Sequence, residues 1–358
     1  MPGGRVRRAC AFLVIALAAG SAGCKESTTV RGYVGSVGDA GCPQEPHCAI
    51  APTPPSRGMS LGCGKTPSQP LGQYQRFSLQ VSCEAEKARD RLYYVRLPPG
   101  YDKNRPYRTV YLGPGCGPPQ DSQPTIPKAY VMETKSDPDA ILIAMEQGFY
   151  NKAEYNRSDC TDSPDAGASL LCHYCFDDGA GTTCPGSVEY GYFDLLHKQI
   201  EEDYCVDTDR QFYAGYSSGG WMAHQLGCQF PDVLRAQASV TGGLPLDIRN
   251  GTKACVDHPI AAFLIHDAMD PSNPYQGSIL ALERLLALNK CTGGTTMATA
   301  PTAPYTITGR PNTATFSCVQ YTGCPAEYPI VFCTSMGLAH DSQASAAVPG
   351  FWEFFDRF

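Results

Sequence analysis

The chain carries the run Gly215-Tyr216-Ser217-Ser218-Gly219-Gly220 between a β-rich segment, residues 211–214, and a helix-like segment, residues 221–226. A G-x-S-x-G sequence at a strand-to-helix turn lifts its serine hydroxyl above the carboxyl edge of a sheet, and the sharp bend accepts only small residues beside the serine. Alone the motif is weak, because many Gly- and Ser-rich loops match it by chance, and an ordinary turn is the alternative interpretation. Its position between a strand and a helix predicts that Ser217 is a nucleophile.

The surrounding sequence alternates between short β-rich runs and segments whose apolar residues have helical spacing. We expect strands at residues 92–97, 109–112, 140–145, 211–214, 259–265 and 328–333, and helices at 188–204, from about 218, around 279–286 and at 351–355. Alternating strands and helices favour parallel pairing, because each crossover helix returns the chain to the same end of the sheet. The sequence therefore predicts an α/β fold in which helices cover both faces of one mostly parallel sheet.

A serine nucleophile needs a base to take its proton, and the base needs a carboxylate to orient it. When the serine stands at such a turn, the acid and then the histidine follow it in the chain. Beyond the helix that follows Ser217, the histidines are His258, His266 and His340. His258 precedes an expected strand and so lies at the wrong edge of the sheet, and His266 comes before the loop that must carry the acid. His340 follows the last expected strand and is the predicted base, with an ordinary surface histidine as the alternative.

The acid should lie in the loop that follows the strand before the last one. Asp267 and Asp270 both belong to residues 265–271 in that place. Asp270 is further into the loop and has more reach towards the edge of the sheet. One of the two is expected to be a turn carboxylate that bonds its own backbone. The residues alone leave this choice open.

The N-terminus has the pattern of an export signal. Three arginines among the first eight residues precede an apolar stretch, residues 9–19, that is too short to span a bilayer. Residues 21–24 resemble a bacterial lipobox, in which Cys24 is lipidated, with Ser21 in place of the usual Leu. Removing Cys10 and Cys24 from the 18 cysteines leaves 16, an even number that allows full pairing.

These features predict a signal peptide at residues 1–23, a Gly- and Pro-rich tether at 24–60 and one catalytic domain at 61–358. The segment from about 151 to 185 fits no helix or strand and holds four cysteines, so we expect a disulfide-stapled insertion there. The membrane is expected to be a partner only through a lipid on Cys24.

The composition excludes several other partners. The net charge is −7 and no basic stripe is present, which argues against nucleic acid. Many cysteines in an exported chain indicate an oxidising compartment and disulfides. Cys172 and Cys175 have the spacing of half a zinc site, but no second pair stands at zinc-finger distance, so disulfides are the better interpretation. We expect neither a metal nor a cofactor.

Short motifs along the chain carry a family resemblance. They are Gly62-Cys63-Gly64-Lys65, Leu97-Pro98-Pro99-Gly100-Tyr101-Asp102, Pro106-Tyr107-Arg108, Gly115-Cys116-Gly117 and a long block over residues 203–222. Over residues 62–358 they resemble the secreted feruloyl esterase and polyhydroxybutyrate depolymerase group of the α/β-hydrolase superfamily, most specifically at 204–228. The group's His-Gly-x-x-Asp loop is matched by residues 266–270, with Asp267 at the usual Gly. The resemblance implies an α/β-hydrolase fold, Asp270 as the acid and a structural role for His266.

The resemblance also implies an oxyanion hole of backbone N–H groups, from Ser218 and from Gly115 or Cys116. Two motifs depart from the group's pattern. Pro114 stands where the group has His before Gly-Cys, and residues 337–342 lack the Trp and Pro that follow the group's histidine. Both changes lie beside the expected catalytic residues and leave those residues in place. We expect Cys116 to be disulfide-bonded, with a buried free thiol as the alternative.

Together these features predict an exported serine carboxylic ester hydrolase that uses Ser217, Asp270 and His340. The resemblance implies feruloyl or acetyl esters of plant cell-wall polysaccharide as substrate, with hydroxybutyrate polyesters as the second choice. A different class of function is a non-catalytic carbohydrate-binding surface lipoprotein on a hydrolase scaffold. The altered motifs favour that interpretation, whereas the survival of all three residue types in the right order favours the enzyme.

Overall fold

The computed structural model describes residues 58–83, 86–115, 139–146, 188–249, 251, 255–338, 340 and 342–358, all within the unit Thr53–Phe358. The predicted signal peptide, Cys24, nearly all of the predicted tether, Cys116 and the predicted Cys-rich insertion lie outside the described residues. The elements are β1 (Tyr74–Cys83), β2 (Glu86–Arg96), β3 (Tyr107–Gly113), β4 (Ala140–Met145), α3 (Val188–Asp203), β5 (Val206–Tyr216), α4 (Ser218–Gln229), β6 (Ala236–Val240), α5 (Leu246–Arg249), β7 (Ala261–Asp267), α6 (Tyr275–Leu288), β8 (Thr302–Tyr305), β9 (Phe316–Tyr321), β10 (Ile330–Ser335) and α7 (Ser342–Phe355).

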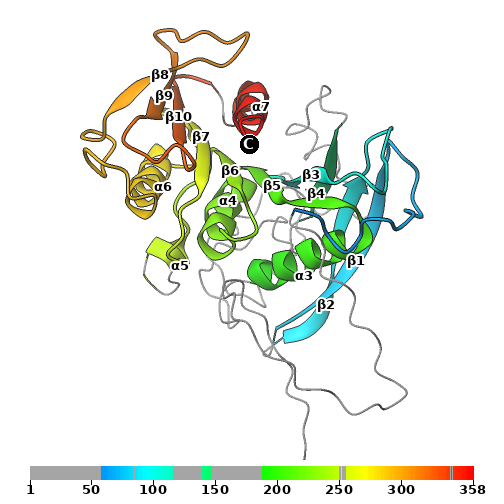
Figure 1. Ribbon diagram of the computed structural model, residues 1–358. Coiled ribbons are helices and arrows are strands. Elements are labelled where there is room, and N and C mark those ends of the chain that lie inside the picture. The colour runs from blue at the N-terminus through cyan, green and yellow to red at the C-terminus, as the bar shows by residue number, and fades with distance from the viewer. Residues whose placement is uncertain are drawn as a thin grey trace, which may run out of the picture. The chain divides into compact units, whose positions relative to one another are not determined.

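The strands form one ten-stranded sheet in the order β1-β2-β4-β3-β5-β6-β7-β10-β9-β8 (Figure 1). Its centre, from β4 to β10, is parallel, and the pairs at both ends are antiparallel. The predicted mostly parallel sheet is confirmed. The sequence alternation missed β1, β8 and β9, because these edge strands join antiparallel neighbours without a crossover helix, and it missed the short, alanine-containing β6.

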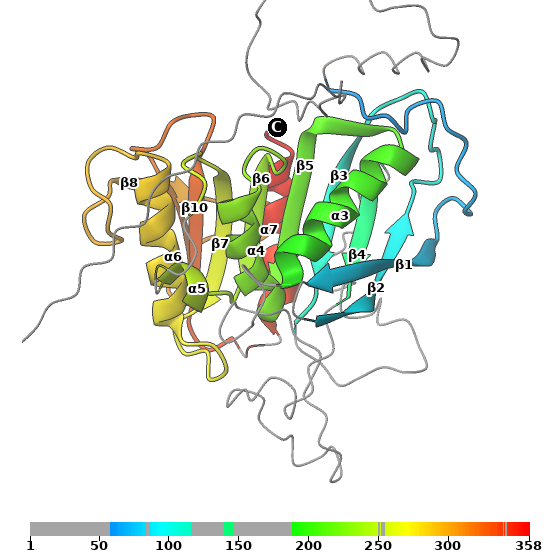
Figure 2. The same cartoon turned by 90° about the horizontal axis from the view of Figure 1, so that it is seen from below.

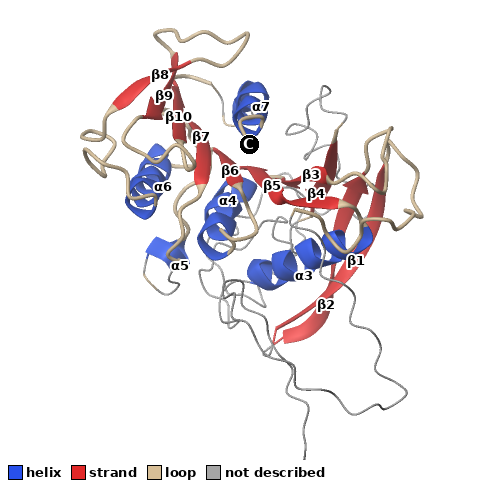
Figure 3. Ribbon diagram, in the orientation of Figure 1, coloured by secondary structure: helices blue, strands red, loops and turns tan. Residues whose placement is uncertain are grey.

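Helices cover both faces of this sheet, as Figures 2 and 3 show. On one face α3, α4 and α6 bury side chains such as Phe193, Met222 and Leu282 in a first apolar cluster. On the other face α7 buries Phe351 and Phe355 in a second cluster against the opposite side of the strands. Both faces of the central strands are therefore buried, which explains why β4 and β7 are apolar almost throughout.

Four neighbouring strands end at the same edge of the sheet. The strands β5, β6, β7 and β10 are parallel, so the loops that follow them leave from one edge. The β7–β10 pairing continues to the Asp267–Ser335 pair, and β7 therefore extends beyond the predicted end at residue 265. Asp267 is thus the last residue of a strand and not a loop residue as predicted, whereas Pro259, which has no N–H to donate, lies before the strand.

Four disulfides join described cysteines: Cys63–Cys205, Cys228–Cys255, Cys291–Cys324 and Cys318–Cys333. Such bonds persist in oxidising compartments, so they indicate an extracellular protein. Within the described ranges, no helix combines the length and apolar character that a membrane crossing requires.

Candidate active site

Ser217 stands in the sharp turn between β5 and α4. Its backbone has φ 54° and ψ −116°, a conformation that side-chain-bearing residues rarely adopt. Such strain costs on the order of 1–3 kcal/mol and persists where surrounding bonds hold it. Here the N–H of Ser217 donates to the Val240 carbonyl over 2.9 Å, and the N–H of Trp221 donates to the Ser217 carbonyl over 3.1 Å.

The glycines around Ser217 let the turn close. A Cβ on Gly215 would lie 2.0 Å from the Gly219 carbonyl oxygen, and a Cβ on Gly219 would lie 2.1 Å from the Gly113 carbonyl oxygen. Neither position accepts any side chain without moving backbone. The predicted requirement for small residues therefore comes from contact of the end of β5 with the first turn of α4 and from contact of that turn with the end of β3.

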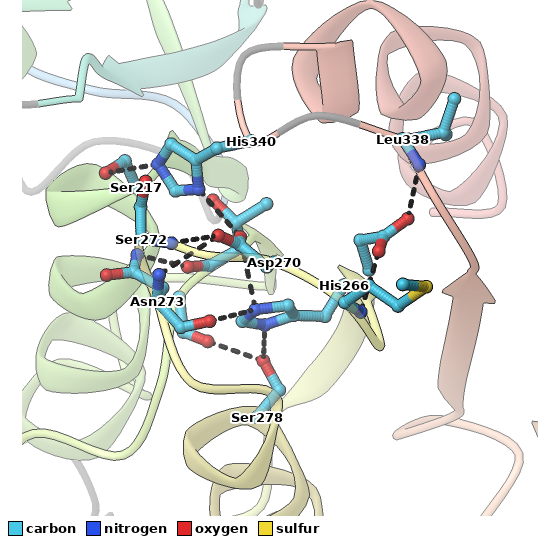
Figure 4. A network of polar contacts seen from close by, with 12 residues as sticks. Ser217, His266, Asp270, Ser272, Asn273, Ser278, Leu338 and His340 are labelled. Atoms are coloured by element: carbon cyan, nitrogen blue, oxygen red, sulfur yellow. Dashed lines mark hydrogen bonds and ion pairs between the residues drawn. The ribbon is translucent and has the colours of Figure 1, made fainter.

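His340 connects Ser217 to Asp270 (Figure 4). The Ser217 hydroxyl lies 3.0 Å from Nε2 of His340, and Nδ1 of His340 lies 2.7 Å from Oδ2 of Asp270. The carboxylate can only accept, so Nδ1 carries the proton and Nε2 is left to accept from the serine. The structure thus brings together the three predicted side chains, from the loops after β5, β7 and β10.

Asp270 is held by its own loop. Its Oδ1 accepts hydrogen bonds from the N–H groups of Ser272 at 2.8 Å and Asn273 at 3.0 Å, and its side chain is fully buried. Burial alone would raise the pKa of Asp270, but the hydrogen bonds from Asn273, His340 and Ser272 outweigh it and lower that pKa below its usual value. The carboxylate therefore stays ionised while it accepts from His340.

His266 is buried beside the loop that carries Asp270 and does not reach Ser217. Its Nε2 donates to the Asn273 carbonyl over 3.0 Å and lies 3.4 Å from Asp270, while its Nδ1 lies 2.5 Å from the Ser278 hydroxyl. Figure 4 shows the imidazole ring of His266 between the loop that carries Asp270 and Ser278. Burial lowers the pKa of His266. These contacts brace the loop that carries Asp270.

The predicted oxyanion donors lie around the start of α4. Ser218 is the first residue of that helix, and its N–H has no helical acceptor one turn earlier. The carbonyl of Pro114 accepts from Gly219 N–H over 3.2 Å, which fastens the loop after β3 to the helix. A Cβ on Gly115 would lie 3.0 Å from Cβ of Ser217, so the Gly115 backbone lies against Ser217. Cys116, the alternative donor, lies outside the described residues.

Asp267 is the residue whose role the sequence did not reveal. It was one of two candidates for a turn carboxylate that bonds its own backbone, and it does accept from Met269 N–H over 2.8 Å. It also accepts from the Ser335 hydroxyl and from the N–H groups of Gly337 and Leu338, in the segment that leads to His340. No sequence pattern signals this contact, because the partners lie 70 and 71 residues later in the chain.

Comparison with known proteins points to one class of enzyme. No family model matches the chain. Feruloyl esterase C of Emericella nidulans is 25% identical over 313 residues, which cover 85% of this chain and 93% of that protein. Feruloyl esterase D of Neurospora crassa is 26% identical over 319 residues, which cover 87% of this chain and 93% of that protein. An acetyl xylan esterase from Aspergillus awamori superposes with a TM-score of 0.50 at 12% identity, over 78% of this chain and 99% of that one.

The sequence matches extend over most of the chain, and the superposition shows that the fold is shared with an esterase. The sheet order, with its parallel centre and a serine in the turn after β5, agrees with that fold. The chain is therefore a carboxylic ester hydrolase of the α/β-hydrolase type, related to the feruloyl esterases.

Proposed function

We propose that the chain hydrolyses carboxylic esters through a Ser217–His340–Asp270 triad and a covalent acyl-enzyme. The observation that carries this proposal is the pair of distances at His340, 3.0 Å from Nε2 to the Ser217 hydroxyl and 2.7 Å from Nδ1 to Asp270. Both lie within hydrogen-bonding range, and the imidazole is oriented before substrate binds.

Acylation begins when Oγ of Ser217 forms a bond to the ester carbonyl carbon and its proton moves to Nε2 of His340. The negative charge that develops on the carbonyl oxygen is held by the backbone N–H groups of Ser218 and of Gly115 or Cys116. The bond to the alcohol oxygen then breaks, and His340 returns the proton to the departing alcohol. Asp270 stays ionised and stabilises the imidazolium that forms in between.

Deacylation repeats these steps with water in place of the alcohol. His340 takes a proton from water as the water oxygen attacks the acyl carbon, and it then protonates Oγ of Ser217 as the serine departs. The products are a carboxylic acid and an alcohol, and the serine is restored. These steps need no cofactor.

The proposed substrates are feruloyl or acetyl esters on plant cell-wall polysaccharide. The support is the sequence relationship to feruloyl esterases and the fold shared with an acetyl xylan esterase. The four disulfides agree with an extracellular place of action. A signal peptide at residues 1–23 and a lipid on Cys24 belong to the proposal as the means of export and anchoring.

A non-catalytic carbohydrate-binding protein is disfavoured by the strained conformation of Ser217. A φ of 54° at a serine costs free energy, and carbohydrate binding alone does not require a strained backbone at that serine. The full set of hydrogen bonds on Asp270 and His340 also supports a working base.

Two assays test the proposal. A fluorophosphonate probe should label the wild-type chain at Ser217, and mass mapping identifies the labelled peptide. A panel of methyl ferulate, p-nitrophenyl acetate and a short hydroxybutyrate oligomer then separates the substrate classes. Turnover of the ferulate or acetate ester supports the proposal, preference for the oligomer assigns a polyesterase instead, and absence of both labelling and turnover contradicts it.

A further inference from the structure

Asp267 joins the end of β7 to the segment that carries His340. It pairs with Ser335 at the last position of the parallel β7–β10 ladder, and it is fully buried. Its Oδ1 accepts from Met269 N–H at 2.8 Å and Gly337 N–H at 3.2 Å. Its Oδ2 accepts from the Ser335 hydroxyl at 2.8 Å and Leu338 N–H at 2.7 Å. Among these bonds between described residues, each carboxylate oxygen accepts two.

Two of these bonds hold the backbone immediately before His340. Leu338 is two residues before the histidine, and Figure 4 shows its backbone nitrogen at the end of the hydrogen bond. Gly337 has φ 83°, a left-handed conformation that glycine adopts without strain, so the chain turns sharply over the carboxylate. The two N–H groups donate to one buried charge, as in anion-binding backbone turns.

From this geometry we infer that Asp267 is a positioning residue for His340, an inference that rests on the function proposed above. The imidazole must meet Ser217 and Asp270 at once, and misplacement of a catalytic group by about 1 Å lowers the rate by about two orders of magnitude. Asp267 does not contact the imidazole. It sets the position of the imidazole by fixing the backbone from which His340 projects.

A carboxylate suits this place because the four groups described above, Met269 N–H, Gly337 N–H, the Ser335 hydroxyl and Leu338 N–H, are all donors. The hydrogen bonds from Ser335, Met269, Leu338 and Gly337 lower the pKa of Asp267 despite its burial, which by itself would raise it. The carboxylate of Asp267 is therefore charged at neutral pH.

Asparagine has the same shape but offers only one acceptor oxygen. Its NH₂ group would face either Gly337 and Met269 or Leu338 and the rotatable Ser335 hydroxyl. In either orientation one of the two N–H groups before His340 loses its acceptor. These hydrogen bonds are part-buried, and a partly buried N–H that loses its acceptor is unfavourable, so the segment should shift.

The test compares Asp267→Asn with Ser335→Ala. The serine variant removes a donor to the same carboxylate and leaves both segment N–H bonds in place. We expect Asp267→Asn to lower kcat roughly 10- to 100-fold with KM changed by less than about twofold, and Ser335→Ala to keep kcat within about threefold. Both are measured with p-nitrophenyl acetate well below each variant's melting temperature. Fluorophosphonate labelling of Ser217 should slow in parallel with kcat, since it requires the same base.

Three outcomes overturn the inference: Asp267→Asn with wild-type kcat, a rise in KM alone, or an equal loss in Ser335→Ala, which indicates general loosening. If Asp267→Asn does not fold, hydrogen exchange on the wild-type chain decides. The Gly337 and Leu338 amides should be protected, and exchange at the rate of free loop amides rejects the contact. An inactive wild-type enzyme contradicts the proposed function instead, so the two failures are distinguishable.

Discussion

The carboxylate of Asp267 accepts a 2.7 Å hydrogen bond from the backbone N–H of Leu338, 71 residues later in the chain. This bond crosses between the ends of β7 and β10 and connects the loop of Asp270 to the loop of His340. The positions of Asp270 and His340 therefore depend on each other through backbone as well as through their direct contact. The site is assembled from strand ends that a parallel sheet brings to one edge.

Ser217→Ala should abolish ester hydrolysis, because the Ser217 hydroxyl is the one that lies within hydrogen-bonding distance of the proposed base His340. Loss of such a nucleophile lowers kcat by roughly 10⁴ to 10⁶. The melting temperature should change little, since the hydroxyl contributes little packing. The matched control is Ser218→Ala, whose proposed role comes from the backbone N–H and whose hydroxyl, among the described residues, donates to the Pro114 carbonyl over 3.4 Å. Initial rates and thermal melts of both variants are the measurement, and retention of a tenth of the activity in Ser217→Ala contradicts the assignment.

Asp270→Asn should be more damaging than Asp267→Asn. Of the two aspartates, Asp270 bonds the imidazole of His340 and fixes its tautomer, and the same change in a known triad lowers kcat about 10⁴-fold. Asp267 bonds the backbone before His340, so its replacement should lower kcat only by displacing the imidazole of His340. Steady-state kinetics of the two variants give the ranking. The reverse order shows that the acid has been assigned to the wrong carboxylate.

Acid should destabilise the fold through His224, a buried residue of α4 whose Nδ1 lies 3.3 Å from Nε2 of Gln237. Burial lowers the pKa of His224 to about 3. In the unfolded chain a histidine has a pKa near 6.5. Between these values the unfolded state binds a proton that the native state does not. The contribution of His224 to stability is therefore complete above about pH 6.5 and declines as pH falls towards about 3, by up to about 1.4 kcal/mol per pH unit.

Urea unfolding at several pH values between about 7 and 4 measures this decline. The variant His224→Gln cannot titrate and should lose stability less steeply over the same range. If it keeps the wild-type slope, the acid sensitivity comes from other groups.

The disulfides should differ in their effect on stability according to the loops they close. Cys63–Cys205 spans 142 residues and Cys318–Cys333 spans 15. In the chain-entropy model a crosslink stabilises by restricting the unfolded chain, by about 5 kcal/mol for the long loop and about 3 kcal/mol for the short one. Replacing both cysteines of each pair by alanine should therefore lower the unfolding free energy more for the Cys63–Cys205 pair. A larger loss for Cys318–Cys333 contradicts the entropic account.

Local chemistry made the sharp turn at Ser217 and the fold class predictable from sequence. The turn at Ser217 needs only a strand, small flanking residues and a helix, all within about twenty consecutive residues of the chain. The alternation of strands and helices predicted the parallel centre of the sheet in the same way. Edge strands such as β8 and β9 were missed, because they pair antiparallel with their neighbours and no crossover helix marks their positions in the sequence.

Tertiary structure alone determined the cysteine pairings, the contacts of both aspartates and the end of β7. Two carboxylates three positions apart in one short segment look alike in sequence, since both follow the same buried run. They differ because β7 pairs with β10 as far as Asp267, and the side chain of Asp267 accepts hydrogen bonds from the backbone of the segment before His340. Asp270, beyond the strand end, is free of the ladder and reaches the imidazole. Local sequence patterns determine the conformation of a short segment. Strand register and burial determine which residues some 70 positions apart become hydrogen-bond partners, and neither can be read from a short stretch of sequence.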